Sequence, residues 1–223
     1  MNSLYFITGT DTGAGKTVLT VLLAAHLRQK KIRVAALKPL CAGGRDDARK
    51  ILAALAGPLT LDEINPWHFR ASLAPALAAQ RENKPVTLGE VTRHLRAVQK
   101  QFAITLVEGA GGLMSPLGEK FDSRDLIVEL AAVPIIVAQN KLGAVNHLLL
   151  TLEALPKNLR VQAKIVLMSP PKPDVASRSN AALLGQFFPP GKIFPLPWLG
   201  KNFTPDAVLQ KPPLQRTLEK MLR

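Results

Sequence analysis

The chain has 223 residues, of which 29 are Lys or Arg and 16 are Asp or Glu, so its formal net charge at pH 7 is +13. No stretch reaches the roughly 18 uninterrupted apolar residues that a membrane-spanning helix needs, and no signal-peptide pattern opens the chain, so we expect a cytoplasmic protein without a membrane partner. The single cysteine, Cys41, excludes an internal disulfide and a multi-cysteine zinc site, and we expect it to be a small, partly buried apolar residue.

The order of apolar segments predicts an α/β fold in one domain, residues 1–223. Short segments that are apolar on both faces suit strands buried between helices, which favours a mostly parallel sheet with helices on both sides. Strands are expected at 4–8, 33–37, 104–108, 134–138, 164–168 and 192–196. Helices are expected at 16–29, 46–55, 88–100, 123–131, 145–155 and 176–187. Ligands of such sheets bind at the carboxyl ends of the strands.

The first expected strand runs into "FITGTDTGAGKT", residues 6–17. A glycine-rich loop between a strand and a helix turns backbone N–H groups toward phosphate oxygens, with Lys16 at the β and γ phosphates and Thr17 on Mg²⁺. Thr10 stands at the first glycine of the usual G-x-x-x-x-G-K-[ST] pattern, and Gly9 lies one residue earlier. The alternative is a glycine-rich turn with an ordinary surface lysine. We therefore expect a fold of the P-loop NTPase type, with a nucleotide in contact with Gly13, Ala14, Gly15, Lys16, Thr17 and Val18.

The second expected strand ends in "ALKPLCAGGRDDARK", residues 36–50. Lys38 ends this strand at the same edge of the sheet, so its cation would lie beside the γ phosphate and could bind a second anionic reactant. Asp46 or Asp47, near the start of the next helix, could reach a metal. The alternatives are a surface strand end for Lys38 and a helix cap for the two aspartates.

The third segment, "ITLVEGAGGLMSPL", covers residues 104–117. Enzymes with a phosphate-binding loop place a second Mg²⁺ ligand on an acidic residue after an apolar strand, so Glu108 is the candidate. The glycines at 109, 111 and 112 allow a close backbone approach to a ligand.

Several ordered motifs resemble the dethiobiotin synthetase family over nearly the whole chain. "GTDTGAGKT" resembles GTDTxVGKT, including the extra residue between the glycines, and "LKPLCAGG" resembles KPxxSG. "INPWHFRASLAP" resembles NPYxFxxPxSP, "LVEGAGGLMSPL" resembles VEGAGGxxxPL, and "NKLGAVNHLLLT" resembles KLGxINHxLLT. The resemblance implies ATP-dependent ring closure of 7,8-diaminopelargonic acid with CO₂, through a carbamate and a carbamic-phosphoric anhydride.

The resemblance also implies roles for individual residues. Lys16 and Lys38 would offset the repulsion between carbamate and ATP, and Thr12 would touch the diamine. Mg²⁺ would be held by Thr17, Asp47 and Glu108, with Asp47 preferred over Asp46. The site would be completed by the second subunit of a homodimer, whose Asn146 and backbone near Gly143 bind the substrate carboxylate. The alternative for Asn146 is a helix cap.

Two departures from the family pattern concern the substrates. Ala42 stands among the substrate-binding residues where a hydroxyl side chain is frequent, which removes one hydrogen bond. Met168 and Ser169 stand where the family commonly has an Asn that recognises adenine, and a thioether cannot replace the paired donor and acceptor of an amide. Backbone groups of the segment "PLPWLGKN", residues 195–202, are then expected to recognise the base instead, with Pro197, Trp198 and Leu199 in contact with the nucleotide.

Three other functions share some features with this sequence. Partitioning ATPases bind DNA or membranes, and the positive net charge of this chain favours such a function. They carry a lysine in the phosphate-binding loop, however, where this chain has Asp11. In addition, no aromatic residues are interleaved with the basic residues at 28–33, 93–100 and 210–223, as nucleic-acid binding would favour. Amide ligases acting on corrinoid precursors need a glutaminase domain for which 223 residues leave no room. A catalytically weakened homologue is the third, because of Ala42 and Met168. We expect no nucleic-acid partner.

Overall fold

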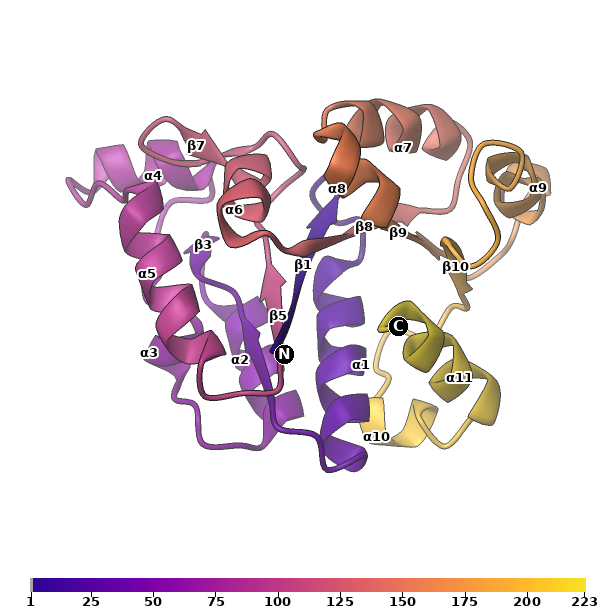
Figure 1. Cartoon of the computed structure of the whole chain (residues 1–223), viewed down its shortest axis with the longest axis horizontal. Helices are drawn as coiled ribbons and strands as arrows, with labels where there is room; N and C mark the ends of the chain where they lie inside the picture. The colour runs from indigo at the N-terminus through magenta and orange to yellow at the C-terminus, as the bar shows by residue number, and fades with distance from the viewer. Residues whose placement is uncertain (1) are drawn as a thin grey trace.

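Strands that are apolar on both faces form the centre of the molecule, as the sequence predicts. The computed structural model describes residues 2–223. Its main sheet has six parallel strands in the order β10-β9-β8-β1-β5-β2 (Figure 1). These are β1 (Ser3–Gly9), β2 (Val34–Leu37), β5 (Ile104–Glu108), β8 (Val133–Gln139), β9 (Lys164–Met168) and β10 (Ile193–Leu196). All six strands expected from the sequence are confirmed.

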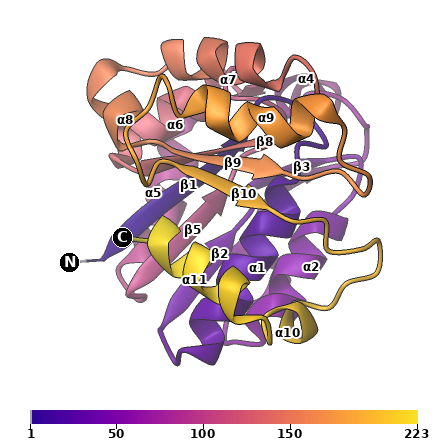
Figure 2. The ribbon, with the colours of Figure 1, turned by 90° about the vertical axis from the view of Figure 1, so that its right-hand side faces the viewer.

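Helices cover both faces of this sheet (Figure 2). One face carries α1 (Lys16–Gln29), α2 (Asp46–Leu55), α10 (Pro205–Val208) and α11 (Pro212–Met221). The opposite face carries α5 (Leu88–Gln99), α6 (Ser123–Leu130), α7 (Ala144–Glu153), α8 (Lys157–Gln162) and α9 (Val175–Leu184). Within the described residues, none of the helices is both long enough and apolar enough to cross a bilayer.

Local sequence signals explain where several helices begin and end. Capping boxes start α5 at Thr87, with Glu90, and α6 at Asp122, with Asp125; each satisfies backbone N–H groups that the first turn leaves free. Helix α6 stops one residue earlier than expected because Ala131 adopts a left-handed conformation, φ 49°. Helix α9 ends at Leu184, three residues before its expected end.

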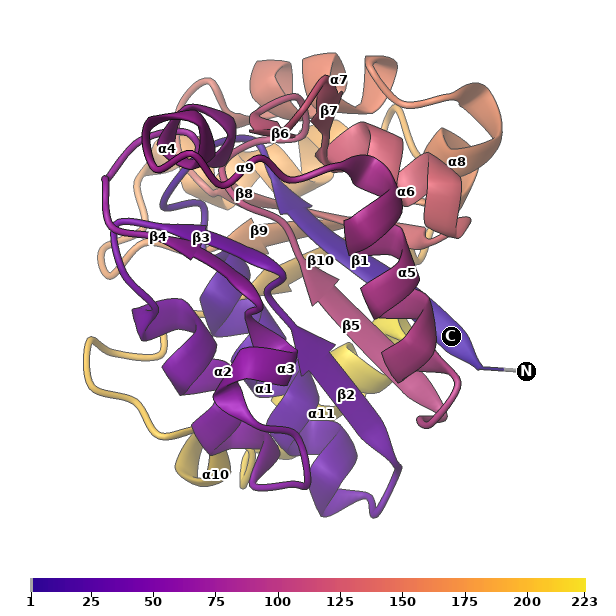
Figure 3. The same cartoon turned by 90° about the vertical axis from the view of Figure 1, so that its left-hand side faces the viewer.

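Short elements that the sequence did not predict complete the fold. Two small sheets pair β3 (Leu40–Ala42) with β4 (Trp67–Phe69), and β6 (Pro116–Gly118) with β7 (Phe121–Asp122). Figure 3 shows the β3–β4 pair between α4 (Pro75–Arg81) and the adjacent α2 and α3 (Leu61–Ile64). Part of the basic segment 210–223 forms α11, whose buried residues Leu214, Leu218 and Met221 repeat at helical spacing.

Helix α1 is enclosed by other elements. Ten of its fourteen residues are buried, and it packs against the sheet, α2, α10 and α11. Strand β1, which leads into α1, lies between β5 and β8 with Ile7 opposite Glu108. Strand β2 pairs with β5 on the other side, with Leu37 opposite Val107. The segments that follow β1, β2 and β5 therefore open at one edge of the sheet.

Candidate active site

The loop between β1 and α1 has the backbone shape of an anion cradle. Gly13 and Gly15 have positive φ angles of 73° and 103°, which glycine adopts without strain. Gly15 is the N-cap of α1 and no side chain caps it, and the first turn contains no acidic residue. The N–H groups and the positive end of the helix dipole therefore remain available to an anion.

Lys16 lies folded against this loop. Its Nζ donates a hydrogen bond to the Asp11 carbonyl oxygen at 3.0 Å, and the residue is buried. Burial and the neighbouring Lys38 lower the pKa of Lys16 to about 8. A bound polyanion would reverse that destabilisation of the ammonium form.

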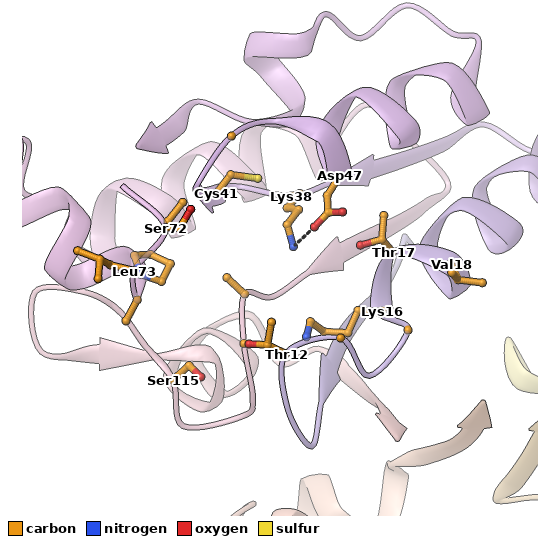
Figure 4. Close-up of a pocket in the computed structure, with 18 residues that line it drawn as sticks. Thr12, Lys16, Thr17, Val18, Lys38, Cys41, Asp47, Ser72, Leu73 and Ser115 are labelled. Carbon is orange, nitrogen blue, oxygen red and sulfur yellow. Dashed lines mark ion pairs between the residues drawn. The ribbon is translucent and has the colours of Figure 1, made fainter. Parts of the chain in front are cut away.

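A cavity of about 810 Å³ opens beside the loop (Figure 4). It collects residues from the loop, the end of β2, the start of α2, the segment before α4 and the segment after β5. Its lining comprises Thr12, Gly13, Gly15, Lys16, Thr17, Val18, Lys38, Cys41, Ala42, Gly44, Asp47, Ser72, Leu73, Ala74, Pro75, Ala110, Gly111 and Ser115. The cavity thus brings together Lys16, Lys38 and Thr12, the three residues to which the sequence analysis gave catalytic roles.

Lys38 is the centre of a buried polar cluster. Its Nζ donates to Glu108 Oε1 at 2.7 Å and to the Gly109 carbonyl at 3.1 Å, and lies 3.5 Å from Asp47 Oδ2. Thr17 Oγ1 donates to the same Glu108 oxygen at 2.8 Å. Burial opposes the charge on Lys38, but the Glu108 and Asp47 carboxylates outweigh it and raise the pKa of Lys38. The ammonium group is therefore held charged.

The oxygen atoms beside Lys38 fit a hard cation. Glu108 is 1% exposed and lies beneath the cavity without lining it, and its Oε2 has no hydrogen-bond partner among the described residues. A buried carboxylate oxygen without a partner is costly unless something else satisfies it. Carboxylate and hydroxyl oxygens are ligands that Mg²⁺ accepts. Residues 2–223 contain no cluster of three His, Cys, Asp or Glu side chains that could hold a metal, so protein carboxylates alone would not complete such a site.

The structure separates the two aspartates, which the residue pattern by itself left open and of which the family resemblance prefers Asp47. Asp46 points to Arg49, with a distance of 3.0 Å between Oδ1 and Nη1, and is exposed. Asp47 faces Lys38 in the cavity. Neither caps α2, because its N-cap is Arg45 and makes no side-chain cap. The helix-cap alternative is therefore wrong for both.

Asn65 is a buried residue that sequence reasoning missed. Its Nδ2 donates to the Lys38 carbonyl at 2.8 Å, and its Oδ1 accepts from Arg45 Nε at 3.0 Å. Arg45 Nη2 also donates to the carbonyls of Asn65, at 2.8 Å, and of Leu61, at 2.9 Å. The amide thus links the backbone that carries Lys38 to the start of α2, which carries Asp47. The motif "INPWHF" was the available signal.

The rim of the cavity around the β3 segment is closely packed. A Cβ on Gly43 would meet Ser72 Oγ at 2.4 Å, so the two chain segments touch here. Cys41 is buried and lines the cavity, and burial raises the pKa of its thiol to about 11. The thiol is therefore protonated and inert, as its expected apolar role requires. Sequence reasoning gave no role to Ser72–Pro75, although they lie in a motif it recognised.

A second cavity, of about 430 Å³, lies on the other side of the loop. It shares Gly13, Gly15 and Val18 with the first cavity. Its other walls come from the segments after β8, β9 and β10: Ala14, Gln139, Asn140, Lys141, Met168, Ser169, Pro170, Pro171, Pro197, Trp198, Leu199, Gly200 and Phe203. Pro197, Trp198 and Leu199, which are expected to contact the nucleotide, thus line a cavity that adjoins the phosphate-binding loop. A nucleotide whose phosphates lie on this loop could place its base there.

Gly143 and Asn146 are not brought to either of these cavities within one chain. Gly143, with φ 86°, is the N-cap of α7, and Asn146 is exposed on the first turn of that helix. The alternative of Asn146 as a helix cap is therefore wrong.

The parallel sheet, the glycine loop and the enclosed lysine at the start of α1 define a P-loop nucleotide-binding protein. A family model described as an AAA domain matches residues 3–201. An ATP-dependent dethiobiotin synthetase BioD of Anaeromyxobacter dehalogenans (strain 2CP-C) is 37% identical, over 86% of this chain and 89% of the relative. The chain belongs to the family of ATP-dependent dethiobiotin synthetases.

Other relatives of the same name support this placement. The protein of Anaeromyxobacter sp. (strain Fw109-5) is 42% identical over 73% of this chain and 74% of its own length. The protein of Methanocaldococcus jannaschii is 38% identical over 73% of this chain and 78% of its own length.

Solved structures with the same fold are more distant in sequence. A ParA family ATPase from Chlorobium tepidum TLS aligns with a TM-score of 0.60 over 100% of this chain and 99% of its own, at 15% identity. pNOB8 ParA bound to nonspecific DNA aligns with a TM-score of 0.55 over 100% and 95%, at 14% identity. At such identities the likeness shows the fold alone.

Proposed function

We propose that this chain closes the ureido ring of dethiobiotin from 7,8-diaminopelargonic acid, CO₂ and ATP. The observation that carries this proposal is the convergence of two buried ammonium groups, Lys16 and Lys38, on one cavity beside the phosphate-binding loop. Two anions must meet in the reaction, a carbamate and a triphosphate. Paired cations in a site of low dielectric offset the repulsion between them.

Lys16 and Lys38 have different roles in the proposed reaction. One amine of the substrate takes up CO₂ as a carbamate, whose oxygen attacks the γ phosphorus while the bond to ADP breaks. Lys16 then stabilises the charge that moves onto the β–γ bridge, and Lys38 holds the carbamate in line. The second amine attacks the carbonyl carbon of the mixed anhydride and expels inorganic phosphate. Thr12 and the wall at Ala42 would hold the diamine.

Thr17, Asp47 and Glu108 would hold Mg²⁺, together with phosphate oxygens. The unpartnered Glu108 Oε2 and the short distance between Thr17 and Glu108 support this assignment. The ion supplies neutralisation of the charge on the β and γ phosphates. Lys38, now bonded to Glu108, would then turn part of its hydrogen-bonding capacity toward the substrate.

The substrate carboxylate would be bound by a second copy of the chain in a homodimer. Gly143 and Asn146 lie at the start of α7, where the backbone N–H groups of a helix terminus suit a carboxylate. Leu142 before this helix is 82% exposed and Leu150 on it is 63% exposed, which gives α7 an apolar surface for a partner.

The test is product formation by the purified chain with diaminopelargonate, bicarbonate, Mg²⁺ and each nucleoside triphosphate. We expect dethiobiotin, identified by mass spectrometry, and one inorganic phosphate released per product. Reactions lacking bicarbonate or nucleotide serve as controls. The absence of dethiobiotin with every nucleotide would contradict the proposed function.

A further inference from the structure

The cavity of about 430 Å³ next to the phosphate-binding loop has both of its amide side chains, Gln139 and Asn140, engaged within the protein. Asn140 is buried; its Nδ2 donates to the Ser177 carbonyl at 2.7 Å, and its Oδ1 accepts from Asn180 Nδ2 at 2.9 Å. Gln139 Nε2 donates to the Gly13 carbonyl at 2.9 Å. Both amides that line the cavity therefore fix the protein's own loops.

Backbone groups at the strand ends are used in the same way. The Asn140 N–H donates to the Met168 carbonyl at 2.9 Å, and the Ser169 N–H donates to the Leu196 carbonyl at 2.9 Å. These bonds continue the sheet beyond β8, β9 and β10. Three further lining residues, Pro170, Pro171 and Pro197, have no N–H to offer.

What faces the cavity is mainly apolar. Met168 packs its thioether against Gly15, where a Cβ would meet Met168 Cγ at 2.8 Å. The Trp198 ring is about half exposed, and Phe203 lies at the same cavity. Aromatic faces stack on any base, because every base has a π face. The remaining polar groups of side chains are the Ser169 hydroxyl, which can donate or accept, and the Trp198 indole N–H and Lys141 ammonium, which only donate and find an acceptor on every base.

We propose that this cavity accepts all four common nucleobases by stacking, so that the chain uses nucleoside triphosphates as a class and not ATP alone. The inference rests on the proposed function, since it takes the triphosphate to lie on the loop at Lys16. Discrimination between bases by side chains needs a matched pair of donor and acceptor, and the two amide side chains that line the cavity, Gln139 and Asn140, donate to groups of the protein itself.

Turnover and binding with ATP, GTP, CTP and UTP test the inference. We expect the four kcat/KM values for dethiobiotin formation, and the four Kd values from calorimetry, to lie within about thirtyfold of one another, the spread that stacking differences produce. A larger preference for ATP overturns the inference and leaves the proposed function standing. If no nucleotide gives product, the proposed function fails, and the calorimetric values still decide whether the base is read.

A variant locates the base. Trp198→Ala should weaken the binding of all four triphosphates by similar factors, about 5- to 100-fold, and leave the binding of inorganic tripolyphosphate unchanged. Phe187→Ala removes an aromatic ring of similar exposure outside the cavity and should change neither. Loss confined to ATP, or unchanged binding of all four to Trp198→Ala, overturns the inference.

Discussion

Lys38 keeps a full positive charge although it is only 5% exposed. It can do so because Glu108 accepts its hydrogen bond and Asp47 lies near. In the proposed reaction this ammonium group acts on the second anion and not on the nucleotide. Its removal should therefore separate turnover from nucleotide binding.

We expect Lys38→Ala to lower kcat by at least about 100-fold, the cost of removing one donor to a developing charge, with the Kd for ATP changed less than about threefold. Steady-state turnover assays measure kcat, and calorimetry measures the Kd for ATP. Loss of an ion-pair partner can also destabilise the protein, by about 3–5 kcal/mol for a buried pair. Lys38→Gln, which retains a donor to Glu108, controls for folding. Equal losses of turnover and ATP binding would place Lys38 in the wrong role.

The sequence identifies charged residues whose place after a strand indicates a role in the site. It does not identify a residue such as Asn65, which acts by positioning another residue. Lys16, Lys38 and Glu108 each follow an apolar strand, so their shared edge follows from the sheet alone. The pair Asp46 and Asp47 leaves open which of them faces Lys38, because that depends on the rotation of α2; the preference for Asp47 came from the family resemblance and not from the residue pattern. Asn65 was missed because its partners at 38 and 45 are far away in the sequence.

The end of β2 and the start of α2 are held together by Asn65. We expect Asn65→Ala to lower the free energy of unfolding by about 1–3 kcal/mol, because the Lys38 carbonyl and Arg45 lose a buried partner. Urea denaturation measures this. The change should also lower kcat more than it raises KM for ATP, since Asn65 positions Lys38 and not the loop at Gly15.

A matched substitution separates these two effects. Asn180 is another buried asparagine, which bonds Asn140 and the Lys141 carbonyl away from Lys38. Asn180→Ala should cost stability with little change of kcat. If both variants lower kcat alike, Asn65 has only a general structural role.

The contact between α1 and α11 contains a titratable group. His26 is buried, with Nε2 3.8 Å from Glu219 Oε1, and Lys30 pairs with the same carboxylate. Burial lowers the pKa of His26 below 6.5, against the effect of Glu219. The folded protein thus binds this proton more weakly than the unfolded chain, so the His26 contribution is full above pH 6.5 and is lost as the pH falls below it.

We expect the free energy of unfolding to fall between about pH 7.5 and about pH 5.5, and to fall less in His26→Leu, which cannot take up the proton. Urea denaturation at both pH values measures the difference. A pH dependence that is the same in both proteins would show that His26 carries no part of it.

Helices with strong end signals were predictable, and short elements were not. The bounds of α1 and α2 agree with the sequence prediction, and α5 differs by one residue. The β3–β4 pair joins two three-residue strands 27 positions apart, Leu40 with Trp67, so no local pattern announces it. Helix α11 has an apolar face formed by Leu214, Leu218 and Met221. From the sequence, residues 210–223 are interpreted only as a basic segment, and no helix is predicted there.

The complete site, in the proposed dimer, depends on two chains. Asn146 and Leu150 lie four positions apart and so share one face of α7, and Figure 1 shows α7 on the outside of the molecule. We expect light scattering to give twice the mass of one chain. Leu150→Asp should yield monomers whose KM for the diamine rises at least about tenfold, with the Kd for ATP unchanged, because a charge is costly in an apolar interface.

Asn146→Ala is the companion variant: it should stay dimeric and still raise KM for the diamine. A wild-type chain that remains monomeric at micromolar concentration and is fully active would contradict both expectations.

The burial of most of α1 has a thermodynamic consequence for ligand binding. Lys16 and Thr17 lie in the first turn of α1, which the neighbouring helices and the sheet already hold in place. The entropy of ordering these groups is spent during folding, before any nucleotide arrives. Conformational changes that accompany nucleotide binding should therefore be confined to the surrounding loops, and the position of α1 should not change.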